Sequence, residues 1–581
     1  AGTDGDVTET ARHLLETETR GDEWAQSVLV DAARQHLSSG DTRTAAHLLE
    51  RADREASGNI ARAEIARLRA RVDGRHDLKS AVEHLRRAGR LGLDPVSLAD
   101  TALDLLDQAM PHSAHLVLLE MAQRARKDFV DPQPETELRL QLAESVFAAG
   151  KRQPATVEFH GLSSASSSTE CLLAAHRVVR AATHLECTHD QLVDALRSLL
   201  TPDVLRGHGF MHTAIVAASL NALVKVGAYG IADALLVSAT TAAGADRRRL
   251  DTIVYTIVRV ESLAMQGRIV EAERALADVG FEECDAFSQC ATMQARWLAA
   301  LRERPGHAST AVRVIPISTT PGLAELGASA AMFVAESTAR VQLLDLDYTD
   351  ALANFDNLET AAQRYSIRNP AFASWRPGRS AALGAIGRVK EGAALAEELL
   401  ELARKFGSPV TIAEALACVA RFRPPEEQVV LLGDALNLIS RTDAELLRCN
   451  LLIDLGFARH HAGDQRAART AFRDGADHAA RFGVTRLAGV AGRGLLACGA
   501  RPRRLQMSGQ KSLTPAELRV VELAVAGHTN AAIAESLFVN VKTVESHLTR
   551  AYRKLGISDR AELKDALGGN DGVGFKGPKP D

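Results

Sequence analysis

The chain has 581 residues, of which 46% are hydrophobic and 24% are charged, and its formal net charge is −4. At this length and hydrophobic content it can bury more than one core, roughly four domain-sized units by length alone. Residues 501–567 contain eleven Lys or Arg against seven Asp or Glu, so the negative excess lies in residues 1–500. Residues 1–500 are therefore not expected to form the nucleic-acid-binding surface.

Cysteine usage and the N-terminus indicate a cytoplasmic protein. Seven cysteines are scattered without a CxxC pair, which is typical of reduced thiols. The first ten residues, AGTDGDVTET, lack the basic and apolar regions of a signal peptide. The most apolar tract, residues 213–240, is interrupted by polar residues and favours a buried helical hairpin over a membrane span. The chain begins without Met, as a processed form or a piece of a longer protein would.

From the start to about residue 500, the sequence is rich in Ala, Leu, Arg and Glu and has no alternating β-type run. Turn signals recur every 34–41 residues, at Gly40, Gly74, Pro111, Gly150, His189, Gly227, Gly267, Gly306, Asp347, Gly387, Pro424 and Gly463. Phrases such as GDTRTAAHLLERA and GRIVEAERALADV follow them. This pattern predicts an all-α solenoid of helical hairpins, similar to tetratricopeptide (TPR) repeats.

Three segments interrupt the repeats. SSASSS at residues 163–168 predicts a flexible loop, and residues 304–322, with three prolines, predict a long connection. RPRRLQMSGQKS at residues 501–512 predicts a basic linker. Its arginines could contact phosphate, although a solvated tether is the simpler interpretation.

Residues 513–567 read as four short helices. Thr514, Pro515 and Glu517 are typical of a helix start, and Gly527 is typical of a helix end. The predicted inward positions of this first helix are Leu518, Val521 and Val525. Thr529 can cap a second helix, and a short turn at residues 538–540 leads to a third helix. Two helices joined in this way form a helix-turn-helix.

The third helix has two distinct faces. Its apolar residues fall at spacings of four, three and four, and they are Val544, Leu548, Ala551 and Leu555. This stripe should face the other helices. The opposite face carries Lys542, Ser546, Thr549, Arg550 and Arg553, with Glu545 at its edge. Cations and hydroxyls suit a DNA major groove. The alternative is a helical bundle whose basic helix is only solvated.

The phrases LTPAE, GHTNAAIAESL, VKTVESHL and RKLGISDRAEL, in this order, resemble the DNA-binding domain of the LuxR family of transcription factors. The resemblance implies base contacts from Glu545, Ser546 and Thr549. It implies phosphate contacts from Lys542, Thr543, Arg550 and Lys554. It also implies that the fourth helix, here residues 559–567, pairs two copies on double-stranded promoter DNA. The sequence departs from the family at Ala516, Ala532 and Asn540, although Asn caps a helix as well as the usual Ser.

Residues 13–52 and 369–416 resemble the C-terminal part of large ATP-binding LuxR-type regulators, the LAL family. Those proteins carry an N-terminal NTPase domain, whereas this sequence has no GxxxxGK[ST] loop to hold phosphates. We therefore expect no cofactor in this chain, and ATP only if an NTPase domain is missing from it. The expected domains are a TPR-like sensor or interaction region at 1–500, the linker at 501–512, the LuxR-type domain at 513–567 and a disordered tail at 568–581.

Other residue groupings are weaker candidates. His208 and His212 have helical spacing for a metal site but lack a third ligand nearby. His184, Cys187 and His189 span an expected turn, where solvated His and a buried Cys are the simpler interpretation. Trp375 either packs between repeats or lines an effector cavity. No arrangement of acids, His and Ser is specific enough to predict catalysis or a catalytic residue.

The leading hypothesis is a non-enzymatic, sequence-specific transcriptional regulator of the cytoplasm. Its repeat region senses a small-molecule or protein effector and controls the C-terminal helix-turn-helix, which binds promoter DNA as a homodimer. RNA polymerase is a further candidate partner, and a membrane is not. The alternatives are a TPR-like interaction scaffold, and the sensor and output part of a longer ATP-dependent switch.

Overall fold

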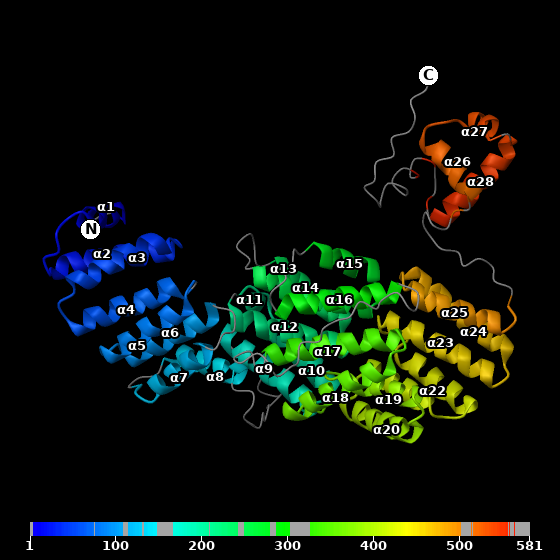
Figure 1. Ribbon diagram of the computed structural model, residues 1–581, viewed down its shortest axis with the longest axis horizontal. Helices are drawn as coiled ribbons and strands as arrows, with labels where there is room; N and C mark the ends of the chain where they lie inside the picture. The colour runs from blue at the N-terminus through cyan, green and yellow to red at the C-terminus, as the bar shows by residue number, and fades with distance from the viewer. Residues whose placement is uncertain are drawn as a thin grey trace.

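The computed structural model describes residues 4–74, 76–108, 114–129, 133–147, 167–207, 209–241, 249–278, 286–302, 326–500, 513, 515–537, 539–555, 557, 560 and 563. Within these residues the regular elements are 28 α-helices, without a strand (Figure 1). None of the described helices is long and apolar enough to cross a membrane. The predicted all-α, TPR-like fold is confirmed.

The helices fall into four groups. The N-terminal repeats, residues 4–147, contain α1 (Asp4–Leu15), α2 (Glu23–Ser38), α3 (Thr42–Glu55), α4 (Asn59–Asp73), α5 (Leu78–Arg90), α6 (Pro95–Gln108), α7 (Ala114–Arg126) and α8 (Pro134–Phe147). The middle repeats, residues 167–302, contain α9 (Ser168–Thr183), α10 (His189–Leu199), α11 (Pro202–Leu205), α12 (Phe210–Lys225), α13 (Tyr229–Thr241), α14 (Arg249–Met265), α15 (Ile269–Ala277) and α16 (Ala286–Arg302).

The C-terminal repeats, residues 326–500, contain α17 (Leu326–Leu344), α18 (Tyr348–Arg364), α19 (Trp375–Ala385), α20 (Val389–Phe406), α21 (Pro409–Ala420), α22 (Pro425–Leu438), α23 (Glu445–His461), α24 (Gln465–Arg481) and α25 (Thr485–Ala497). The last group, α26 (Pro515–Val525), α27 (Asn530–Ser536) and α28 (Val541–Leu555), has a hydrophobic core of its own. The predicted fourth helix of this group lies outside the described residues except for Arg560 and Leu563.

The turn inside most hairpins has one recurring geometry. Gly227, Gly267 and Gly463 have φ of 86°, 76° and 87°. In each case the next residue donates its N–H back into the last turn of the helix, as in the 2.9 Å bond from Ala228 N to Leu223 O. Only glycine adopts this left-handed conformation without strain, so its spacing marks the repeat.

The predicted turn positions agree with the structure wherever it describes them. Eight of the twelve lie in the turn between the paired helices of a hairpin, namely Gly40, Gly74, Gly227, Gly267, Asp347, Gly387, Pro424 and Gly463, and His189 begins α10 directly after such a turn. Pro111, Gly150 and Gly306 lie outside the described residues. At two turns a leucine occupies the left-handed position, Leu185 with φ 64° and Leu346 with φ 66°. These two turns carry the backbone strain that glycine avoids elsewhere.

Two other sequence predictions are settled by the middle repeats. The apolar tract at residues 213–240 is the α12 and α13 hairpin, as predicted. The loop predicted at residues 163–168 is wrong at its end, because Ser167 caps α9 and Ser168 is its first residue. Ser167 and Glu170 form a reciprocal capping box, which converts a flexible composition into a helix start. The connection predicted at 304–322 and the linker at 501–512 lie outside the described residues.

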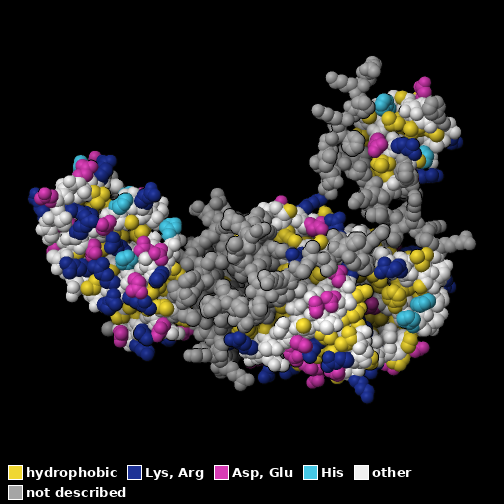
Figure 2. Space-filling view, viewed as in Figure 1, with side chains coloured by type: hydrophobic (Ala, Val, Ile, Leu, Met, Phe, Trp, Pro, Cys, Tyr) yellow, Lys and Arg dark blue, Asp and Glu magenta, His cyan; other side chains and the backbone are white. Residues whose placement is uncertain are grey.

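The N-terminal repeats bury residues that are close in sequence. One core contains buried residues from Ala11 to Val72, and a second extends from Ala70 to Ala143 and adds Met211 of α12. On their surface, basic and acidic side chains are intermixed (Figure 2). The N-terminal repeats therefore form a solenoid in which each repeat packs mainly against its neighbours in sequence.

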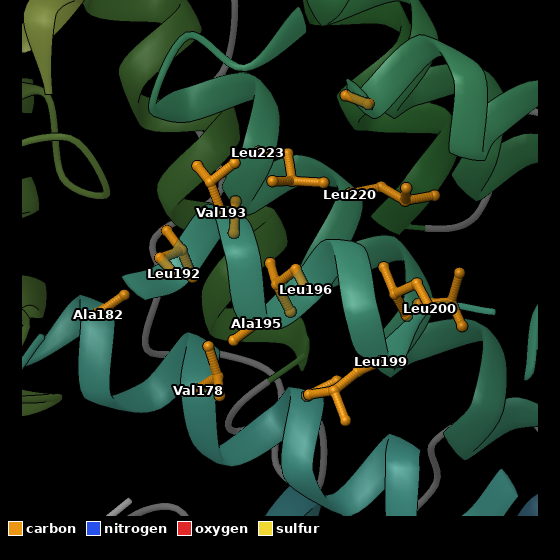
Figure 3. Packing of buried hydrophobic residues seen from close by; sticks show 14 of the residues in the cluster. Val178, Ala182, Leu192, Val193, Ala195, Leu196, Leu199, Leu200, Leu220 and Leu223 are labelled. Atoms are coloured by element: carbon orange, nitrogen blue, oxygen red, sulfur yellow. The ribbon is translucent and has the colours of Figure 1, made fainter. Parts of the chain in front are cut away.

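The middle and C-terminal repeats instead share their cores. Leu192 and Leu196 of α10 and Val178 of α9 belong to one buried cluster (Figure 3). The same core includes Phe406 and Ala444, more than 200 residues later in the chain. A second core combines residues 260–301 with residues 446–498, and α14 contacts α23 while α16 contacts α25.

Hydrogen bonds fasten these distant repeats together. The Asn369 side-chain amide donates to Ala182 O at 2.9 Å, and the Asn369 and Arg368 backbone N–H groups donate to Thr183 O. Ser408 Oγ donates to Val226 O at 3.0 Å. Both side chains are fully buried. Arg368 and Asn369 thus cap the C-terminal end of α9, and the array folds back on itself from residue 167 onward.

Candidate nucleic-acid interface

The start of α28 is fixed by local hydrogen bonds. Thr529 Oγ1 accepts from Ala532 N at 3.3 Å and caps α27, as predicted. Asn540 Oδ1 accepts from Thr543 N at 2.8 Å at the start of α28. Gly527 has φ 91° and follows α26, again as predicted. The capping role predicted for Thr514 lies outside the described residues. These short connections hold α27 and α28 as a helix-turn-helix.

The apolar stripe predicted on α28 faces the domain core. Val544, Leu548 and Ala551 are buried, and Leu555 is partly buried against the same cluster. They pack with Ile533 and Ala534 of α27 and with residues of α26. The third helix is therefore held by its apolar side and presents its other side to solvent.

The inward face predicted for α26 is partly wrong. Val525 is 37% exposed, and the buried side chains are Glu517, Val520, Val521 and Ala524. The spacings 517, 520, 521 and 524 describe one helical face, and Val525 lies about 100° away from Ala524. The sequence did not indicate this buried face because Glu517 is charged and was not expected to be buried.

Five of the eight predicted contact residues are exposed on α28. They are Lys542, Glu545, Ser546, Thr549 and Arg550. Thr543 is half-buried. The side chains of Arg553 and Lys554 lie outside what the structure describes. The exposed residues combine two cations, two hydroxyls and one carboxylate along one face of the helix.

Two hydroxyls among the eight predicted contact residues already donate hydrogen bonds within the domain. Thr543 Oγ1 donates to Asn540 Oδ1, and Thr549 Oγ1 donates to Glu545 O, at 2.8 and 2.9 Å. Thr549 keeps its oxygen lone pairs for an external donor. A phosphate contact by Thr543 as donor would require its hydroxyl to turn away from Asn540. Thr543 is therefore first of all part of the helix cap.

Arg560 has a positioning role that the sequence reasoning did not assign. Its guanidinium donates to Asn530 Oδ1 at 2.8 Å, to Ala524 O at 3.3 Å and to His528 O. It thus satisfies backbone carbonyls at the end of α26 and ties them to the first residue of α27. Asn530 and Arg560 both belong to the sequence segments that resemble the LuxR family, and this resemblance could have indicated that the two residues interact.

The weaker candidates have structural explanations. Trp375 is 3% exposed and packs with Phe355 and Leu358 in a core between repeats, which favours the packing interpretation. His212 Nε2 lies 2.6 Å from Val204 O, while His208 lies outside the described residues. Cys187 is buried in the turn between α9 and α10, and burial raises the pKa of its thiol to about 12. Among the described residues, no three His, Cys, Asp or Glu side chains are grouped to hold a metal.

Comparison with known proteins matches the same segment. The family model described as bacterial regulatory proteins of the luxR family matches residues 511–566. Mb0914c of Mycobacterium bovis, whose name describes an HTH-type transcriptional regulator, is 46% identical over 63 residues. LiaR of Bacillus subtilis, named a transcriptional regulatory protein, is 42% identical over 64 residues.

These matches are short relative to the proteins concerned. The first covers 11% of this chain and 7% of the relative, and the second covers 10% of this chain and 30% of LiaR. Among solved structures, the Cut9–Hcn1 complex aligns with 80% of this chain and 90% of its own, at 13% identity and a TM-score of 0.38. The segment defines a helix-turn-helix domain. Residues 511–566 are a LuxR-family domain, carried by a chain whose other described residues form helical repeats.

Proposed function

We propose that this protein is a sequence-specific, double-stranded DNA-binding transcriptional regulator. The observation that carries the proposal is the exposed face of α28, with Lys542, Ser546, Thr549 and Arg550 around Glu545. This helix follows a helix-turn-helix turn and belongs to a LuxR-family segment. Such a helix enters the major groove of DNA, where cations contact phosphates and polar side chains read base edges.

The proposed contacts divide into two kinds. Lys542, Arg550 and Lys554, with Thr543 after release of its cap, contact phosphates. Glu545, Ser546 and Thr549 read bases, and Arg553 extends the basic face. One helix-turn-helix reads only a few base pairs, so two copies bind adjacent half-sites, paired through residues 559–567. Residues 513–567 act as the DNA-binding domain, 501–512 as its linker and 568–581 as a tail.

The repeat region, residues 1–500, is proposed to act as the sensor. Its closed arrangement from residue 167 onward forms a partly open cavity, which suits a small-molecule effector better than an extended scaffold for peptides. In this proposal the protein acts in the cytoplasm, has no enzymatic activity and communicates with RNA polymerase at the promoter. ATP has no proposed site in this chain.

The test is a binding-site selection with the whole chain, followed by affinity measurements across a salt series. Arg550→Ala should weaken binding to all sequences alike and reduce the slope of log affinity against log salt by about 1. Glu545→Ala and Thr549→Ala should change the selected bases, with losses of about 1–3 kcal/mol at the affected positions. Arg519→Ala removes an exposed cation from α26 and is the matched control, with no effect expected.

An unchanged base preference in both Glu545→Ala and Thr549→Ala would refute the assigned readout. If the whole chain selects no sequence at any salt concentration, the regulator proposal fails and the scaffold alternative takes its place.

A further inference from the structure

A cavity of 310 Å³ lies inside the closed part of the repeat array. Its wall is formed by α9, α12, α14 and α17, by Cys290 of α16 and Leu358 of α18, and by the segment 367–373. Most of this wall is apolar, and its larger side chains are Val254, Ile257, Met332, Phe333 and Phe372. The volume and lining are typical of a site for a small, mainly apolar molecule.

Charged side chains occupy one end of the cavity. Lys225 Nζ donates to both carboxylate oxygens of Glu336, at 3.2 and 3.3 Å, and lies 3.9 Å from Glu261 Oε1. Arg340 Nη1 donates to Glu261 Oε1 at 3.2 Å, and Arg340 also pairs with Glu336. Lys225, Glu261 and Glu336 line the cavity, so two carboxylates face it for each ammonium group.

Glu261 has one oxygen that these pairs leave unused. The side chain is 1% exposed, and its Oε2 has no hydrogen-bond partner among the described atoms. A buried carboxylate oxygen without a donor is costly, on the order of 1–3 kcal/mol. Glu261 lines both this cavity and an adjoining one of 80 Å³. Its Oε2 is closed to solvent in this structure, so a donor from either space reaches that oxygen after a rotation of the side chain.

We infer that this cavity binds a mainly apolar small molecule that carries one N–H or O–H group, and that this group donates to Glu261 Oε2. The inference rests on the proposed sensing role of the repeat region and gives it a site and a ligand class. The segment 367–373 forms part of the wall and is fastened to α9 by Asn369. A bound ligand therefore stabilises the contact that closes the array.

The experiment uses the whole chain without DNA and the fluorescent probe N-phenyl-1-naphthylamine, an apolar molecule with one N–H donor. Binding should be saturable at one probe per chain. Ala218 is exposed and lines the cavity, whereas Ala234 is exposed on α13 and does not. Ala218→Phe should fill the space and weaken probe binding at least tenfold, and Ala234→Phe should leave it unchanged.

The donor is tested with 1-phenoxynaphthalene, which has an ether oxygen in place of the N–H and the same number of non-hydrogen atoms. The wild-type chain should prefer the amine about tenfold, and Glu261→Gln, which can place an amide N–H where Oε2 lies, should abolish that preference. Far-UV circular dichroism checks that each variant is folded.

Two results would overturn the inference. Probe binding that is equal in the wild type and Ala218→Phe places the probe outside the cavity. Equal affinity for amine and ether in the wild type would show that Glu261 Oε2 does not accept a hydrogen bond from the probe. Neither result depends on DNA, so a failure of DNA binding is a separate outcome that concerns α28 alone.

Discussion

The N-terminal repeats, residues 4–147, and the repeats from 167 to 500 share one hairpin unit but close their cores differently. In the first region the buried clusters join neighbouring helices. In the second, a hydrogen bond connects residues 187 positions apart, and the cores join residues more than 200 positions apart. Within this second region, the turn glycine lies against another repeat at Gly227 and in open space at Gly463. The comparison teaches that the repeat unit alone does not determine the shape of the array. The shape also depends on which residues of other repeats pack against the turns.

The largest expected effect comes from a turn glycine in the closed region. In Gly227→Ala the new methyl group would overlap Val410, and the left-handed φ adds strain. We expect a loss of about 2–4 kcal/mol in the free energy of unfolding of this region. Gly463→Ala has the same φ strain and nothing within 4 Å, so it should lose only about 1 kcal/mol.

Urea unfolding followed by circular dichroism, with hydrogen exchange to localise the change, compares the two variants. Equal losses would mean that the contact between repeats contributes nothing to stability.

The second expected effect concerns Asn369. In Asn369→Ala the carbonyl of Ala182 loses a buried donor and the backbone N–H of Ala371 loses its acceptor. We expect a loss of about 2–3 kcal/mol and faster hydrogen exchange at the end of α9. Asn450→Ala, which removes a bond only to Leu446 O within α23, is the control. Protection of α9 that survives in Asn369→Ala would show that packing alone closes the array.

The third expected effect falls in the N-terminal repeats and depends on pH. Glu55 is buried and accepts from the backbone N–H groups of Arg20, Gly21 and Asp22, at 3.0, 2.6 and 3.1 Å. Burial raises the pKa of this carboxyl, but the three backbone donors and Arg51 outweigh it, so the net shift is downward. Its stabilisation is complete above the ordinary glutamate pKa of about 4.3 and is lost as the pH falls through the lower folded-state pKa.

Glu55→Gln should therefore cost about 1.5–3 kcal/mol at pH 7 and remove part of the acid sensitivity of α1 to α3. Hydrogen exchange of these helices between pH 3 and pH 7 measures it. An identical pH dependence in the variant and the wild type would contradict the role of Glu55.

The smallest expected effect has the opposite sign. Leu346 is 62% exposed and holds the left-handed conformation with φ 66°. Leu346→Gly relieves that strain, loses little burial and should stabilise the turn by about 0.5 kcal/mol. Leu185→Gly has the same backbone benefit but removes a buried side chain, so it should destabilise. Thermal unfolding of both variants tests whether burial at Leu185 is the reason for its strained backbone.

The sequence predicted what local physics determines. Turn glycines such as Gly227 and Gly463, the cap at Thr529 and the stripe of Val544, Leu548 and Ala551 were all found, because each depends on residues a few positions apart. The register of α26 was partly wrong, because a buried Glu517 looks like a surface residue. Base and phosphate roles on α28 remain predictions.

The closure of the array was not visible in the sequence. Asn369 begins a segment that resembles the LAL family, but its partner at Ala182 is 187 residues away and periodicity carries no information about such a pair. Nothing in the sequence distinguished Glu261 and Glu336 from the other acidic residues of the helices. Their burial follows only from the way in which α14 and α17 meet inside the closed region.

The bond from Asn369 to Ala182 also has a consequence for synthesis on the ribosome. When α9 has emerged, its C-terminal cap is still 187 residues from being made. At about 5–20 residues per second this interval is roughly 10 to 40 s. During that time the apolar wall of the cavity is open to solvent, so the nascent middle repeats are a natural substrate for chaperones.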